Sequence, residues 1–205
     1  MPLIINKLKM KKIILLLSVV FLSTSALQAQ DSKFYLGIGV GYATAGGDIA
    51  DDFGIEGGIN LKFIDMGYRF NESWGITAGL NSSGHGFENV DADDLVVGVA
   101  SFSVGPMYSL PVGSASWDIK PQLAISYKGK EDGDLSLDGT YSGSAFILGN
   151  SFVFGDGGKG FAWSIDVDYR MGKFKEYSDS LGSVDIDDNN SLNNLNIGVG
   201  VRYNF

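Results

Sequence analysis

The feature that most constrains this chain is the strict alternation of apolar and polar residues over its last eleven positions, 195–205. The apolar positions are Leu195, Ile197, Val199, Val201, Tyr203 and Phe205, and the positions between them are Asn196, Gly198, Gly200, Arg202 and Asn204. Successive side chains of an extended strand point to opposite faces, so all six apolar side chains share one face. The segment therefore predicts a β-strand with one apolar face.

The same period of two recurs along the chain and predicts eight strands. We expect them at 33–45, 58–70, 74–83, 95–110, 116–128, 140–154, 161–174 and 192–205. Each is long enough to cross a membrane, because a tilted strand needs about 9 to 11 residues to do so. Short connections at 71–73, 111–115 and 155–160 alternate with long polar ones at 46–57, 84–94, 129–139 and 175–191. In an up-and-down barrel, the short turns then meet at one rim and the long loops at the other.

The first 29 residues have the pattern of a secretory signal peptide. Four lysines precede the apolar run 13–22, and small and polar residues follow up to Ala29. This run is too short and wrongly flanked for a membrane-spanning helix. We expect cleavage after Ala29, with Met10 as a possible true start, and a single domain formed by residues 30–205.

Acidic residues dominate the chain after this leader. Residues 30–205 contain 11 Lys and Arg against 24 Asp and Glu, and most of these acids fall in the four long connections. The excess of acid makes nucleic acid an unsuitable partner. The sequence has no cysteine and one histidine, so we expect no disulfide, no zinc site and no cofactor.

Tryptophans mark the rim of the short turns. Trp74, Trp117 and Trp163 each begin a predicted strand directly after a short connection. Amphipathic aromatic rings gather where a barrel meets the lipid headgroups. The three tryptophans therefore predict an aromatic girdle at this rim.

The polar faces of the strands indicate which side faces lipid. In 33–45 and 74–83 these faces consist largely of glycine and other small residues. A solvated outer face would carry Lys and Glu, whereas small side chains suit the crowded interior of an eight-stranded barrel. The apolar faces are therefore expected to point outward.

Charged residues on the polar faces predict an interior network of ion pairs that fills the lumen. The set comprises Asp65, Arg69, Asp118, Lys120, Lys128, Asp166, Asp168, Arg170 and Arg202. Charges in a narrow interior are costly unless they are paired. The opposite phase would place an arginine in lipid, which costs about 2 to 4 kcal/mol at the midplane.

Three predicted strands are less regular than the others. The phase changes between Phe63 and Ile64 and again near Ala100, which predicts at each place a β-bulge or a strand that continues above the membrane. The segment 140–154 has apolar residues on both faces, so its inward face stays unassigned.

These features together resemble the small outer-membrane β-barrel proteins of Gram-negative bacteria, in particular the porin-like outer-membrane protein β-barrel domain family, over residues 33–205. The resemblance implies an all-β fold, an eight-stranded antiparallel up-and-down transmembrane barrel integral to the cell outer membrane, in contact with its lipid and lipopolysaccharide. It also implies that the last strand is the signal for the barrel-assembly machinery. The positions of that signal are Phe205, Tyr203, Val201, Val199 and Ile197.

Three functions remain open at this point. The first is a non-enzymatic structural or surface-interaction role through the acidic loops, with an unknown ligand. The second is a narrow porin-like channel for small solutes. The third is a lipid A-modifying enzyme, because the segment 82–88, with Ser82, Ser83, His85 and Glu88, supplies the residue types of a Ser/His/Glu set.

Two segments are candidates for chemistry, and a simpler interpretation is favoured for each. The serines, His85 and Glu88 are crowded into one glycine-flanked segment, which disfavours a preorganised triad, so we expect a solvated loop histidine. The segment 185–190 offers oxygen ligands for calcium but lacks the glycine and distal glutamate of an EF-hand loop. We expect a solvated acidic loop there and predict no metal site.

Overall fold

A computed structural model describes residues 33–88, 96–132, 139–155, 158–186 and 190–205. The predicted leader, 1–29, lies outside the described residues. So do seven acidic residues of the predicted loops, namely Asp91, Asp93, Asp94, Asp134, Asp138, Asp187 and Asp188.

The described part of the chain is almost entirely β-structure. The elements are β1 (Phe34–Ala43), α2 (Asp48–Phe53), β2 (Ile55–Arg69), β3 (Trp74–Phe87), β4 (Val96–Val112), β5 (Ala115–Asp132), β6 (Thr140–Phe154), β7 (Gly160–Asp179), β8 (Gly182–Asp185) and β9 (Ser191–Asn204). In these residues, no helix has the length and apolar character needed to cross a membrane.

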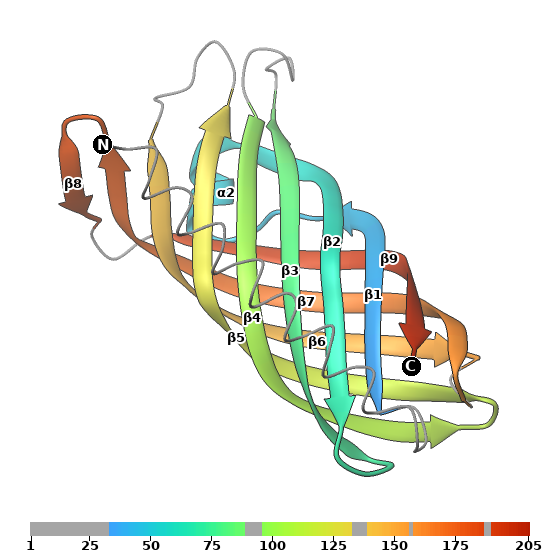
Figure 1. Ribbon diagram of the computed structural model, residues 1–205. Helices are drawn as coiled ribbons and strands as arrows, with labels where there is room; N and C mark the ends of the chain where they lie inside the picture. The colour runs from blue at the N-terminus through green and yellow to red at the C-terminus, as the bar shows by residue number, and fades with distance from the viewer. Residues whose placement is uncertain (1–32, 89–95, 133–138, 156–157, 187–189) are drawn as a thin grey trace, which may run out of the picture.

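Eight long strands close into a ring, which confirms the predicted fold class. Consecutive strands from β1 to β7 pair antiparallel, and β9 pairs with both β7 and β1. The short strand β8 continues the sheet above the ring through its pairing with β7, and this hairpin projects from one end of the barrel (Figure 1). A closed ring leaves no unpaired strand edge, which is the condition for a sheet to span lipid.

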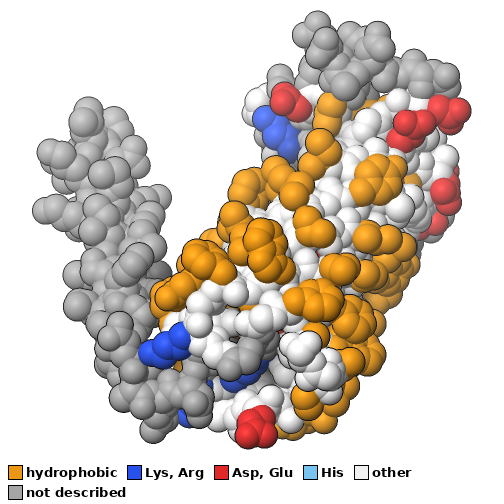
Figure 2. All heavy atoms as spheres, turned by 90° about the vertical axis from the view of Figure 1, so that its right-hand side faces the viewer, with side chains coloured by type: hydrophobic (Ala, Val, Ile, Leu, Met, Phe, Trp, Pro, Cys, Tyr) orange, Lys and Arg blue, Asp and Glu red, His pale blue; other side chains and the backbone are white. Residues whose placement is uncertain are grey.

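Apolar side chains cover the outside of the ring. Along β1, Leu36, Ile38 and Val40 point outward, whereas Tyr35 and Ala43 are buried inside. Figure 2 shows the apolar side chains as a band over one face, with acidic side chains gathered toward one end. The band matches the lipid-facing surface of a transmembrane barrel.

The irregularities differ in part from expectation. The register between β2 and β3 shifts between Lys62 and Ile64, as the sequence predicts. β4 keeps its register along its pairing with β3, so the first alternative near Ala100, a bulge in this strand, is wrong, and the strand instead runs without a break from Val96 to Val112. The apolar residues there change face because the interior of the barrel becomes apolar toward the loop end.

A bulge that the sequence did not reveal lies instead in β5. Phe102 and Ser103 of β4 are adjacent, but they pair with Ser126 and Ala124. Ile125 is therefore an extra residue, and the face that each later residue of β5 presents is reversed.

The structure also assigns the face of β6 that the sequence left open. Ala145, Ile147 and Val153 are buried inside the barrel, whereas Phe146 and Phe152 point outward. Both faces of this strand are apolar because its inner face contributes to apolar parts of the interior.

Several strands run farther toward the loop end than predicted. β3 continues to Phe87, β5 to Asp132 and β7 to Asp179. In the upper parts of these strands the outward positions carry glycine or charged residues instead of apolar ones, so the apolar period of two is no longer visible in the sequence. The backbone pairing nevertheless continues. The predicted loop at 84–94 therefore begins four residues later.

Candidate functional site

The polar interior of the barrel begins near the short turns with Asp118 of β5, which is fully buried. Its carboxylate accepts a hydrogen bond from Arg202 Nη1 at 2.7 Å and lies 3.5 Å from Arg69 Nη2. Ser109 Oγ donates a further hydrogen bond to it at 2.6 Å. One carboxylate thus joins four strands, β2, β4, β5 and β9.

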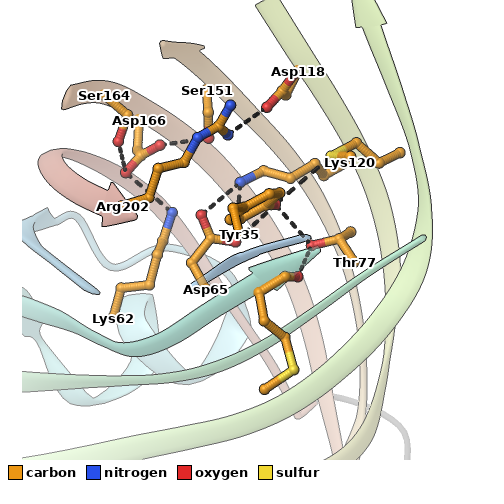
Figure 3. A network of polar contacts seen from close by, with 12 residues as sticks. Tyr35, Lys62, Asp65, Thr77, Asp118, Lys120, Ser151, Ser164, Asp166 and Arg202 are labelled. Carbon is orange, nitrogen blue, oxygen red and sulfur yellow. Dashed lines mark hydrogen bonds and ion pairs between the residues drawn. The ribbon is translucent and has the colours of Figure 1, made fainter. Parts of the chain in front are cut away.

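A second group of contacts lies directly above. Lys120 Nζ is 3.1 Å from Asp65 Oδ2, and the hydroxyl of Tyr35 donates to Asp65 Oδ1 at 3.3 Å. The guanidinium of Arg202 lies 4.4 Å from the centre of the Tyr35 ring, in the geometry of a cation–π contact. Figure 3 shows how these side chains converge from opposite walls.

Lys62, which is not among the nine residues predicted for the interior, completes the network. Its Nζ lies 3.3 Å from Asp166 and 3.0 Å from Asp168, and Ser151 and Ser164 donate hydrogen bonds to Asp166 (Figure 3). The sequence contains a local indication that Lys62 points inward, because Lys62 lies between the outward-facing Leu61 and Phe63. The register shift directly after Phe63 hides this alternation.

The structure places eight of the nine predicted network residues inside the barrel and corrects the ninth. Arg170 is buried higher in the interior, with Nη1 3.5 Å from Ser83 Oγ. Lys128 lies on the outer face, because the extra residue Ile125 reverses the phase of β5 before it. With Lys62 in its place, four acids face five bases.

His85 is buried in the upper interior, so the expectation of a solvated loop histidine is wrong. The residue is 0% exposed on β3. Its Nε2 lies 3.0 Å from Ser83 Oγ and 3.2 Å from Asn194 Nδ2, and its Nδ1 lies 3.1 Å from the backbone carbonyl of Glu56. A carbonyl thus occupies the place that a carboxylate would take in a triad, and the serine faces the interior of the barrel.

An apolar cluster fills the upper interior around His85, since its member Val97 is paired with His85. It comprises Ala50, Ile55, Val97, Val99, Tyr127, Ala145, Phe174 and Leu192. The rings of Tyr127 and Phe174 stack at 4.8 Å, and the Tyr127 hydroxyl donates to the carbonyl of Leu192 at 3.2 Å. These contacts join β5, β7 and β9 across the mouth, which is the opening of the barrel at its loop end.

The short helix α2 lies over this cluster. Ala50 is its buried residue, and glycines with positive φ, Gly47 and Gly54, flank the helix and let the chain turn sharply at both ends. Asp48 is linked to β9, because Ser191 Oγ donates to its carboxylate at 2.7 Å. The mouth is therefore closed by packed side chains and a helical turn.

Tyr141 and Glu131 form a polar pair at the edge of the mouth, above the apolar band. The Tyr141 hydroxyl donates to Glu131 Oε1 at 3.0 Å. Burial, together with the nearby Glu131 carboxylate, raises the pKa of Tyr141 to about 12. The phenol therefore stays a hydrogen-bond donor across the physiological pH range.

A small cavity beside Lys62, Asp166, Asp168 and Asn196 has room for about one water molecule. Among the described residues, no three His, Cys, Asp or Glu side chains are grouped so as to hold a metal ion.

The three tryptophans lie near the short turns. Trp74 and Trp163 are exposed on the outer face, and Trp117 is half-buried, stacked on Phe152 at 5.5 Å. The indole N–H of Trp117 donates to Asn150 Oδ1 at 3.2 Å.

The end of β9 places its apolar residues outward. Ile197, Val199, Tyr203 and Phe205 are exposed on the outer face. The backbone N–H of Phe205 donates to the carbonyl of Phe34 at 3.0 Å, and the two rings lie 5.3 Å apart. The last residue is therefore part of the seam between β1 and β9.

The model of a family described as outer membrane protein beta-barrel domain matches residues 14–205. No curated protein matches the chain in sequence.

Solved structures of low identity share the fold. Neisserial surface protein A (NspA) of Neisseria is 16% identical with a TM-score of 0.51, and the match covers 86% of this chain and 99% of that one. Ail, the attachment invasion locus protein of Yersinia pestis, in complex with the heparin analogue sucrose octasulfate, is 16% identical with a TM-score of 0.50, covering 85% and 100%.

Proposed function

Because this chain belongs to the outer membrane protein beta-barrel domain family and is integral to the outer membrane of a Gram-negative bacterium, we propose that it is a non-enzymatic barrel that acts through its outer surfaces. Its partners are then the lipid around it and molecules that reach the loop end of the barrel from outside the cell.

The observation that carries this proposal is the filled interior. Asp118, Lys120 and Lys62 link opposite walls through ion pairs, and the apolar cluster under α2 closes the mouth. An eight-stranded barrel has just enough room for its own side chains. The filled interior therefore disfavours the alternative of a channel for small solutes.

The burial of His85 disfavours the alternative of a lipid A-modifying enzyme. A substrate acyl chain approaches from the membrane, on the outer face of the wall. Ser83 and His85 point to the inside, and both are buried. A nucleophile and its base need access to the reacting atom, which this placement denies.

The loop end presents the surfaces on which an external partner can bind. The β7–β8 hairpin stands above the ring, with Leu181 at its tip 95% exposed and Val184 exposed beside it. Asp179 and Asp185 on the same hairpin, and Asp51 and Asp52 on α2, make the described part of this end acidic. Charge complementarity favours a neutral or cationic partner.

The last strand and the network carry two supporting proposals. The outward residues Phe205, Tyr203, Val201, Val199 and Ile197 form the signal that the barrel-assembly machinery reads, and the apolar band contacts outer-membrane lipid, including lipopolysaccharide. The interior charges fix the walls relative to one another so that the loop end is presented rigidly.

The proposal is tested with two measurements on the same protein. Purified barrel added to planar lipid bilayers is expected to give no sustained conductance steps. Cells that express the protein are expected to attach to surfaces or to other cells better than deletion cells. A variant in which Leu181 and Val184 are both changed to Ser should lose that attachment, because the hairpin then lacks its apolar contacts.

The control replaces Leu123 and Ile125, two exposed residues of the lipid-facing band, with Val. It should attach like the wild type, since the hairpin is intact. Stable conductance together with unchanged attachment of the hairpin variant would favour the channel instead.

A further inference from the structure

Four lysines point outward directly above the apolar band on β5 and β7. They are Lys128, Lys130, Lys173 and Lys175, and all four are exposed. Their neighbours in the chain, Tyr127, Gly129 and Phe174, are buried inside the barrel, so the lysines lie on the outer wall. The two strands are separated only by β6.

These lysines account for every basic side chain on the outer wall away from the short turns. Of the 11 Lys and Arg after the leader, five lie in the interior, and Lys33 and Lys159 stand at the short-turn end. The remaining four form this cluster, which we call the β5–β7 basic patch. In a chain with such an excess of acid, a local concentration of positive charge indicates an anionic ligand.

The heights of the lysines match the upper boundary of the hydrocarbon layer. Lys128 follows Trp117 by 11 residues, and Lys173 follows Trp163 by 10 residues. At about 3.3 Å per residue and a strand tilt of about 40°, both steps rise about 25 to 28 Å. The apolar band of such barrels is about 25 Å tall, so both lysines reach the headgroups of the outer leaflet.

The wall around the patch has the layering that such a ligand needs. Immediately below lies an apolar row formed by Leu123, Phe146 and Met171, which are paired across β5, β6 and β7. Between the lysines, β6 presents the hydroxyls of Ser142 and Ser144, which are paired with Lys128 and Lys173 respectively. Hydroxyls and ammonium groups therefore lie side by side directly above an apolar surface.

Three acidic residues of the described chain border this region, namely Asp132, which is exposed on β5 two residues beyond Lys130, Glu176, and Asp185, which is paired with Glu176. Glu176 pairs with Ser142 across from Lys128, is half-buried, and accepts a hydrogen bond from Ser178 Oγ at 2.9 Å. The four lysines outnumber these three carboxylates, so the described part of the patch keeps a positive charge.

We propose that the β5–β7 basic patch binds the phosphate groups of a phosphorylated glycolipid of the outer leaflet, such as the lipid A part of lipopolysaccharide. The ammonium groups of Lys128 and Lys173 meet the phosphates, the hydroxyls of β6 meet the sugar, and the acyl chains lie on the apolar row below. This inference rests on the membrane placement of the barrel and not on the loop-end partner proposed above.

The position of the patch favours a lipid over a soluble anion or an extracellular sulfated polysaccharide. The patch lies on the side wall at the membrane boundary, where a lipid headgroup is always present. The described loop end above it is acidic, and it would repel a long polyanion that approached from outside.

Binding is measured with full barrel extracted from outer membranes into neutral detergent, with a chelator present so that divalent cations do not bridge acidic groups. The probes are bisphosphorylated lipid A and the same lipid with both phosphates removed. Each lysine near an anionic lipid surface is worth about fivefold in affinity. The variant Lys128→Gln/Lys173→Gln should therefore bind the phosphorylated lipid about 30-fold more weakly.

Two controls keep the result specific. Lys33→Gln/Lys159→Gln removes the same charge at the opposite end of the barrel and should change binding less than about twofold. Lys128→Arg/Lys173→Arg retains the charge and should bind like the wild type. Heat-modifiable migration on gels verifies that each variant is a folded barrel.

Three outcomes would overturn the proposal. The first is wild-type affinity in the Gln variant, and the second is equal binding of the dephosphorylated lipid. The third is a loss of binding to heparin fragments or inorganic phosphate with no change for lipid A. Failure of the attachment experiment leaves this measurement unaffected, so the two proposals can fail separately.

Discussion

Asp118 is the residue on which most of the interior charge depends. Arg202 and Arg69 share its carboxylate, and Ser109 donates to it, all inside a fully buried environment. A buried ion pair adds little net stability over an apolar replacement, but removing one partner leaves the other charge uncompensated.

We expect Asp118→Asn to lower the free energy of unfolding by about 3 to 5 kcal/mol, because two guanidinium groups then lose their counter-charge. The change preserves size and a hydrogen-bond acceptor for Ser109. Urea unfolding of the barrel in lipid vesicles, followed by tryptophan fluorescence, measures the effect. Glu72→Gln, at an exposed acid in a short turn, is the control and should shift the midpoint little; equal stability of the two variants would contradict the interior role of Asp118.

At the scale of the element, the seam between β1 and β9 decides whether the sheet closes. The two strands approach closely where glycines face each other, with Gly41 opposite Gly198 and Gly39 opposite Gly200. A Cβ atom added at Gly41 would meet the backbone carbonyl oxygen of Ile197 at less than contact distance. The glycines of the first strand are thus required by closure as much as by interior space.

Gly41→Ala should destabilise the barrel by about 1 to 3 kcal/mol, because the backbone of β9 has to move to admit the methyl group. The temperature at which the protein loses its heat-modifiable migration reports this loss. Gly86→Ala is the matched control, since a Cβ at Gly86 meets nothing within 4 Å. A seam variant as heat-resistant as this control would show that the strands do not meet so closely.

At the scale of the whole molecule, charge is sorted into separate regions. Paired charges fill the middle of the barrel, acids mark the described loop end, and the remaining lysines lie at the short turns and in the β5–β7 basic patch. An apolar band encloses the middle. This sorting gives the barrel a defined height and direction in an asymmetric membrane.

The carboxyl end belongs to this scale because assembly places the whole barrel in the membrane. Removing Phe205 should reduce the amount of protein in the outer-membrane fraction several-fold, since the proposed assembly signal loses its terminal aromatic residue. Fractionation of cells with antibody detection measures it. Phe205→Tyr keeps an aromatic ring there and should assemble normally; normal assembly without Phe205 would contradict the proposed signal.

The sequence predicts most of the fold because a period of two is a local property. Each strand needs only its own residues to show which side chains share a face, and Arg202 or Asp166 could be assigned to the interior in this way. The position of the tryptophans after short turns is equally local. The family resemblance then follows from the pattern repeated over eight strands.

The tertiary structure decided the features that depend on pairing between strands. The extra residue Ile125 is visible only in the pairing of β5 with β4, and it moved Lys128 from the predicted network to the outer wall. In the same way, continued pairing of β3 with its neighbours placed His85 inside the barrel instead of in a loop. The sequence by itself therefore determined that a barrel forms and which faces are apolar, whereas register between neighbouring strands determined which charges meet inside it and which face the membrane.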